Sequence, residues 1–247
     1  MEQRSGRPAT GVSGALVSGL GGAALALLLA LSCAMAARAD DPANTAADVD
    51  PRSQTAEDVL RATTDRILAV IEEARSYVDE NPERYYAAVQ KVLDPVVDFR
   101  GFARGVMGDY ATTERYRNLD EAGREKLRGQ LERFSETMRR GLVRTYSKGL
   151  LAFGGSRVEI PDSNEGQVGD DRATLRQLIY SDTGQPYVVI YQMARDRDGR
   201  WLMRNLIVEN VNLGQIYRNQ FEDAARRFKG DLDAVIENWS ADTLDDA

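Results

Sequence analysis

The chain has 247 residues, a formal net charge of −7, no histidine and a single cysteine. Without histidine, the Ser-His-Asp and Cys-His arrangements of nucleophilic catalysis and His-ligated zinc are excluded. The acidic balance argues against nucleic acid as the main partner, because binding phosphates requires a concentrated basic surface.

Residues 1–39 have the pattern of a secretory signal peptide. Arg4 and Arg7 precede a long apolar run, which ends in the small-residue sequence A-R-A at 37–39. Cleavage after residue 39 would leave 208 residues with a net charge of −9, and it would remove Cys33 and any disulfide with it. Two alternatives stay open: the apolar run remains as a membrane anchor, or Cys33 is lipidated.

The mature chain is expected to form one domain over residues 56–239. Residues 40–55 are acidic, contain proline and have few apolar side chains, so they predict a flexible leader. Residues 240–247 predict an acidic tail of the same kind. No internal repeat or linker divides the segment between them.

The first half of this domain is predicted to be helical. Apolar residues recur at helical spacing from residue 56, with proline-containing breaks at 81–82 and 94–95. Asp98 is a suitable N-cap and Gly108 a suitable C-cap for a third helix. Asp120 is expected to cap the longest helix, which should run to about residue 151.

The third helix is unusual because it carries glycine beside apolar residues. Glycine costs roughly 0.8–1 kcal/mol against alanine in a helix interior. Gly101 and Gly105 admit two interpretations: close backbone packing, or space kept open beside a cavity. In the second interpretation, the cavity wall is formed by Phe102, Val106 and Met107.

The longest helix carries an apolar stripe from Leu127 to Leu150 at helical spacing. Such a stripe normally packs into the core. Its long or flat side chains could equally line an apolar cavity, and methionine adapts well to cargo of variable shape. The residues in question are Phe134, Met138, Leu142 and Tyr146.

The second half is predicted to be a sheet followed by helices. Strands are expected at 173–181, 187–195 and 201–212, with a hairpin turn at 196–200. Helices at 213–229 and 232–239 complete an α+β fold. Leu178, Tyr180, Val189, Tyr191, Met203 and Ile207 are expected to share one face of the sheet. The central strand is apolar on both faces and needs a cover on each, or a cover and a ligand.

Three blocks of the sequence together resemble one family. They are VLDPVVDFRGFARGVMGDY, LERFSETMRRGLVRTYSKGLLAF and YVVIYQMARDRDGRWLMRNLIVENVNLGQIYRNQF. They look like the blocks "DF…A…VLG.Y", "F…L…TY...L" and "V.Y.....G.W.V.D...EGVSL...YR.QF" of the MlaC family, also called the toluene-tolerance auxiliary component of an ABC transporter. The resemblance covers roughly residues 56–239.

This resemblance implies a periplasmic phospholipid carrier. Such a protein has no catalytic residues and no cofactor, and it binds only its lipid cargo. Its fold would be a helical N-terminal half and a curved antiparallel sheet that enclose an apolar lipid pocket. Its partners would be an outer-membrane MlaA-type lipoprotein complex and an inner-membrane ABC transporter complex with an MlaD-type component. Such a carrier maintains outer-membrane lipid asymmetry, and a monomer is expected.

The apolar residues singled out above are then the expected lipid contacts. They are Phe102, Val106, Met107, Phe134, Met138, Leu142, Tyr146, Leu178, Tyr180, Val189, Tyr191, Met203 and Ile207.

The chain departs from the family pattern at Asn205, where the family usually has Asp, and at 210–212, where Asn-Val-Asn replaces Gly-Val-Ser. Cargo or partner preference could therefore differ, and a hopanoid-associated carrier of the same family is an alternative. Two other interpretations stay open. One is a small α+β enzyme that pairs Tyr180 or Tyr191 with Asp98, and the other is an adaptor with a filled core.

Overall fold

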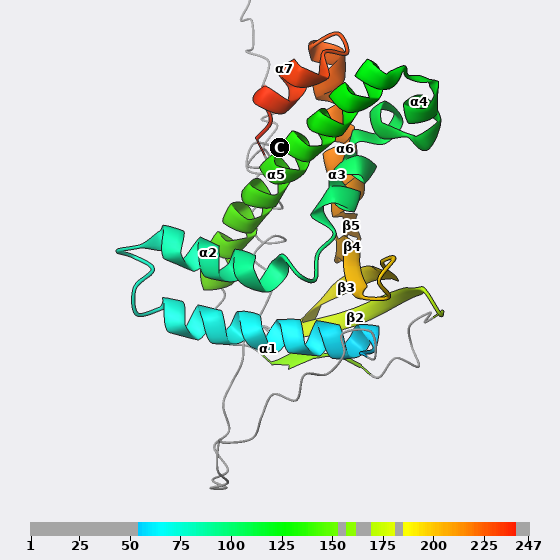
Figure 1. The fold of residues 1–247 in the computed structure, drawn as a ribbon. Helices are drawn as coiled ribbons and strands as arrows, with labels where there is room; N and C mark the ends of the chain where they lie inside the picture. Colours follow the sequence, from blue (N-terminus) through cyan, green and yellow to red (C-terminus); the bar gives the residue numbers. More distant parts are fainter. Residues whose placement is uncertain (1–53, 153–156, 162–168, 181–184, 241–247) are drawn as a thin grey trace, which may run out of the picture.

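The computed structural model describes residues 54–152, 157–161, 169–180 and 185–240, so the expected signal peptide, most of the leader and the acidic tail lie outside the described residues. The N-terminal half is helical, and a sheet and two further helices follow it, as the sequence predicts (Figure 1). The helices are α1 (Ala56–Ala74), α2 (Pro82–Leu93), α3 (Phe99–Met107), the 3-10 turn η1 (Gly108–Ala111), α4 (Thr113–Asn118), α5 (Glu121–Ala152), α6 (Leu213–Arg227) and α7 (Leu232–Glu237). The strands are β1 (Val158–Glu159), β2 (Arg172–Tyr180), β3 (Pro186–Arg195), β4 (Trp201–Val208) and β5 (Val211–Asn212).

Helix α1 begins at a capping box, in which Thr55 accepts a hydrogen bond from the backbone of Asp58 and the Asp58 carboxylate accepts one from Thr55. It ends at Ala74, earlier than the proline-containing break at 81–82 predicts. The hydroxyl of Ser76 donates to the carbonyl of Glu73, and this local bond competes with the helical ladder. The segment between α1 and α2 is therefore a series of turns.

Helix α5 is the longest of the described helices, with 32 residues. Figure 1 shows it running diagonally from α4 and α7 at one end to α2 at the other. Asp120 caps its start by accepting from the backbone of Gly123 at 2.7 Å. Because one straight element spans both ends, its successive turns contact different neighbours.

The five strands form one antiparallel sheet in the order β1-β2-β3-β4-β5. The predicted hairpin turn joins β3 to β4. Its Asp196 carboxylate accepts from the backbone N–H groups of Asp198 and Arg200, and Gly199 adopts a φ of 80°. A register shift lies between Gln192 and Met193, where β4 contains one extra residue.

The prediction that six sheet residues share one face is wrong. Opposite residues in an antiparallel pair lie on the same face, and faces alternate along each strand. Val189, Tyr191 and Met203 lie on the inner face, toward the helices. Leu178, Tyr180 and Ile207 lie half-buried on the outer face, because their partners are Val188, Pro186 and Ile190. Strand length and apolar content do not reveal register, so the sequence pattern could not separate the two sets.

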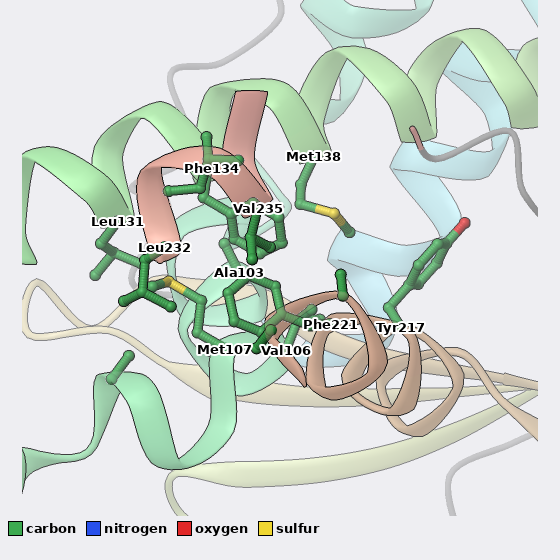
Figure 2. Packing of buried hydrophobic residues seen from close by; sticks show 14 of the residues in the cluster. Ala103, Val106, Met107, Leu131, Phe134, Met138, Tyr217, Phe221, Leu232 and Val235 are labelled. Carbon is green, nitrogen blue, oxygen red and sulfur yellow. The ribbon is translucent and has the colours of Figure 1, made fainter. Parts of the chain in front are cut away.

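A core filled by side chains lies between α3, α5, α6 and α7 (Figure 2). Phe134 and Phe221 meet at 4.9 Å between ring centroids, and Trp239 packs edge-on against Phe134 at 5.1 Å. Val106, Met107, Phe134 and Met138 are almost completely buried in this cluster. These four side chains are therefore part of the interior that holds α3 and α5 together.

The glycines of α3 serve different purposes. A methyl group at Gly101 would collide with the carboxylate of Asp98 and come within 2.9 Å of the Arg204 guanidinium, so this glycine permits close packing. Gly108 has a φ of 53° and ends the helix as predicted. A methyl group at Gly105 would meet no described atom within 4 Å.

Replacing Gly101 with alanine is expected to lower the free energy of unfolding by about 1–2 kcal/mol, because the new methyl group displaces the Asp98 carboxylate that caps α3. Gly105→Ala is the matched control on the same helix. It should raise stability by about 0.5–1 kcal/mol, since it adds helix propensity without a clash. Urea denaturation of both variants measures the difference, and equal stability of the two would contradict the packing argument.

Candidate functional site

An apolar cavity lies beside the filled core, between α1, α2, the C-terminal half of α5 and the inner face of the sheet. It leaves about 160 Å³ that the centres of water molecules could occupy, and about 1000 Å³ of atom-free space when its opening to solvent is included. Its wall is almost entirely apolar. The residues that line it are Leu60, Thr63, Thr64, Ile67, Val89, Leu93, Val97, Phe99, Phe102, Leu142, Val143, Tyr146, Ser147, Leu150, Tyr191, Met203, Arg204, Asn205, Leu206 and Leu213.

Helical periodicity builds two of the walls. The lining residues of α1 are at positions 60, 63, 64 and 67, and those of α5 are at 142, 143, 146, 147 and 150. These spacings place each set on one face of its helix. Leu60 and Ile67 of α1, and Val143 and Leu150 of α5, are buried with their apolar atoms toward this region. The cavity is therefore enclosed by regular elements rather than by loops.

A chain of buried hydrogen bonds ties α1 to the sheet behind the cavity. The hydroxyl of Tyr191 donates to the Gln177 side-chain carbonyl at 2.8 Å, and the Gln177 amide donates to the Thr64 hydroxyl at 3.0 Å. Gln177 is fully buried. Burial raises the pKa of the Tyr191 phenol far above its ordinary value, so it stays neutral and donates this bond.

A second tyrosine closes the cavity toward the filled core. Tyr146 of α5 lies with its hydroxyl 3.3 Å from that of Tyr217 on α6. Burial, and after it the neighbouring Tyr217, raises the pKa of Tyr146 well above the ordinary value. Phe102 packs edge-on against Tyr217 with 6.2 Å between ring centroids. These aromatic rings form the boundary between the hollow and the packed parts of the interior.

The charged member of the described lining is Arg204, and it is the extra residue of β4 at the register shift. Its guanidinium pairs with the carboxylate of Asp98 at the start of α3, and burial lowers its pKa without removing its charge. The backbone of Asp98 donates to the Met203 carbonyl at 3.0 Å, which fixes the start of α3 against β4. The bulge therefore places an apolar side chain, Met203, and a charged one next to each other at the cavity.

The asparagines that depart from the family pattern hold the start of α6. Asn212 is the N-cap of α6 and accepts from the backbone of Gln215 at 3.1 Å. The Asn205 side chain donates to Asn212 at 3.0 Å and accepts from the backbone of Gly214 at 3.1 Å. The two amides thus position Leu213 at the cavity wall, next to Asn205 itself.

The structure divides the expected lipid contacts into three groups. Phe102, Leu142, Tyr146, Tyr191 and Met203 line the cavity together. Val106, Met107, Phe134 and Met138 lie in the filled core, where their neighbours are protein side chains (Figure 2). On the sheet, Val189 is buried in the inner cluster without reaching the cavity, while Leu178, Tyr180 and Ile207 lie on the outer face.

Several lining residues escaped the sequence reasoning, notably the α1 stripe and Ser147. The 60, 63, 64, 67 spacing was visible as an amphipathic face, but a threonine pair in such a stripe is an ordinary helix feature. Ser147 was hidden within the apolar series of α5. Only the arrangement of neighbouring elements shows that these side chains surround unfilled space.

The residues proposed for an enzyme each have other partners. Asp98 caps α3 and pairs with Arg204, and Tyr191 donates to Gln177. Tyr180 lies on the other face of the sheet, where its hydroxyl donates to Glu159 at 3.2 Å. Within the described ranges there is no group of three or more metal-ligating side chains, and no helix combines the length and apolarity of a membrane span.

Comparison with known proteins shows similarity to a protein family, to a curated protein and to a solved structure. The model of the MlaC protein family matches residues 61–241. The toluene tolerance protein Ttg2D of Pseudomonas putida is 30% identical over 192 residues, which are 77% of this chain and 82% of that protein. A solved structure of a phospholipid-binding protein from Ralstonia solanacearum, in complex with a phospholipid, matches with a TM-score of 0.62 at 18% identity, covering 78% of this chain and 98% of the other. At that identity the likeness shows the fold.

Replacing Thr64 with valine should lower the free energy of unfolding by about 1–3 kcal/mol, because it leaves the buried Gln177 amide without its acceptor. Thr63→Val is the matched control. The Thr63 hydroxyl donates only to the carbonyl of Val59 within its own helix, and its loss should cost less than about 1 kcal/mol. Thermal or chemical denaturation compares the two, and an equal effect would show that the Gln177 bond does not stabilise the wall.

Proposed function

Because the chain belongs to the MlaC family, we propose that it is a periplasmic phospholipid carrier whose cavity buries acyl chains. The carrier unit is residues 56–239, exported by the N-terminal signal peptide. It exchanges lipid between an outer-membrane lipoprotein complex and an inner-membrane ABC transporter complex. The observation that carries the proposal is the apolar, partly open cavity between α1, α2, α5 and the sheet.

The size of the barrier explains why a carrier is needed. Two acyl chains have about 30 methylenes, and each is worth roughly 0.8 kcal/mol when it leaves water. Free transfer of a phospholipid through the periplasm therefore costs more than about 20 kcal/mol. A wall of leucine, isoleucine, valine and phenylalanine offers surroundings as apolar as the bilayer. Loading and unloading then become nearly balanced exchanges, which require no catalytic residue.

The dimensions of the cavity support the same proposal. An unfilled space of about 160 Å³ costs the folded state about 4 kcal/mol, at about 24 cal/mol per Å³. An acyl chain that enters the cavity supplies the van der Waals contacts that the unfilled space lacks. Binding of lipid should therefore also stabilise the folded protein.

Extraction of the purified mature protein, followed by mass spectrometry of the organic phase, tests the proposal directly. A diacyl phospholipid in an amount comparable to the protein is expected. A hopanoid in its place would support the alternative carrier of the same family. Protein that contains no lipid, and takes none up from phospholipid vesicles, would refute the proposal.

A substitution separates a carrier from an adaptor with a structural interior. Leu142→Trp adds bulk at the cavity wall, and we expect lipid content to fall severalfold while the protein still unfolds cooperatively. Leu131→Trp makes the same change on the same helix inside the filled core. It should lower stability by about 1–3 kcal/mol through overpacking and leave lipid content per folded molecule unchanged. Native mass spectrometry measures both, and an unchanged lipid content in Leu142→Trp would favour the adaptor.

A further inference from the structure

Ser147 differs from the other hydroxyl-bearing residues of the cavity wall. It lies on α5 and lines the cavity, and it is 0% exposed to solvent. Its side-chain oxygen has no hydrogen-bond partner among the described residues. Its backbone carbonyl, by contrast, accepts from the hydroxyl of Tyr85 at 3.1 Å. The side chain is thus a buried donor and acceptor that the protein itself leaves unused.

The neighbouring hydroxyls of the wall are all engaged. Thr63 donates to the carbonyl of Val59 at 2.6 Å, and Thr64 accepts from Gln177 at 3.0 Å. The hydroxyls of Tyr146 and Tyr191 have tyrosine and glutamine partners, as described above. Burying a polar group without a partner is unfavourable, and most buried polar groups in proteins are hydrogen-bonded. The exception at Ser147 therefore calls for a partner that enters the cavity from outside.

We propose that the Ser147 hydroxyl donates a hydrogen bond to the ester carbonyl of the bound lipid and so makes the protein select ester-linked over ether-linked chains. This inference rests on the proposed carrier function. A saturated acyl chain has no hydrogen-bonding atom along its length. In a diacyl lipid the ester carbonyl is the strong acceptor attached directly to the apolar chain, and a lone hydroxyl in an apolar wall matches that single acceptor.

The pairing has a geometric consequence for the cargo. The ester group must pass the opening of the cavity and reach the wall formed by α5. The carbonyl end of one acyl chain is then held inside the protein. The rest of that acyl chain extends along the apolar residues next to Ser147. These include Val143 and Leu150, each about one helical turn away on α5. The hydrogen bond thereby fixes how deeply the lipid sits, in addition to its affinity.

Two probes that differ only in the linkage test this: dipalmitoyl phosphatidylglycerol and its dihexadecyl ether analogue. The unsubstituted protein, freed of lipid, should bind the diester about 2- to 12-fold more tightly, as one neutral hydrogen bond allows. In Ser147→Ala the preference should disappear, mainly through weaker binding of the diester. Ser147→Thr keeps the hydroxyl and should keep the preference.

Ser135→Ala is the matched control, because Ser135 is buried on the same helix but is not part of the cavity lining. It should retain the unsubstituted protein's ratio of affinities. Equal binding of diester and diether by the unsubstituted protein would overturn the inference, and so would a preference that persists in Ser147→Ala. If neither lipid binds the unsubstituted protein, the proposed carrier function itself fails. The comparison in the unsubstituted protein decides the matter even if the alanine variant does not fold.

Discussion

The hydrogen bonds of Gln177 are the interaction on which the shape of the interior depends. A fully buried amide on β2 connects Thr64 of α1 to Tyr191 of β3, and so it sets where the first helix lies against the sheet. Dispersion forces alone would draw the helix inward until side chains filled the gap. A polar bridge of fixed length opposes that collapse, because breaking it would leave buried donors and acceptors unpaired. The cavity can therefore persist as a feature of the folded chain.

Helix α5 combines two kinds of interior in one rigid element. Up to Met138, the buried side chains of this helix, Phe134 among them, pack against α3, α6 and α7 (Figure 2). Along its second half, Leu142, Tyr146 and Ser147 line the cavity. The tight packing around the first part of α5 supplies stability that the part beside the cavity lacks. The proposed carrier thus keeps one end of its long helix fixed while the other end meets the cargo.

The sequence predicted those features that depend on neighbouring residues in the chain. The caps at Asp98 and Gly108, the break at 94–95 and the hairpin at 196–200 follow from local hydrogen bonding and backbone preference, and the structure confirms them. The face of Leu178 depended on the register between strands, and a register error of one residue moves a whole strand's side chains to the other face.

Distinguishing core from cavity wall required the third dimension. Met138 and Leu142 belong to the same apolar stripe, four residues apart, and nothing in their identity separates them. The difference lies in what stands opposite: α6 and α7 fill the space beside Met138, whereas the elements beside Leu142 are held apart. An expectation built from periodicity alone therefore overstates the number of residues that line the cavity.

The register shift in β4 has an evolutionary consequence. Arg204 is the extra residue of β4 at the bulge and has no partner on β3. Strand pairing therefore does not constrain which side chain stands at this position. Mutation can exchange the charge at the edge of the hollow while the backbone pairs on both sides remain intact. The position can therefore vary among related chains without a change in strand pairing, and what such a change disturbs is the ion pair with Asp98 at the start of α3.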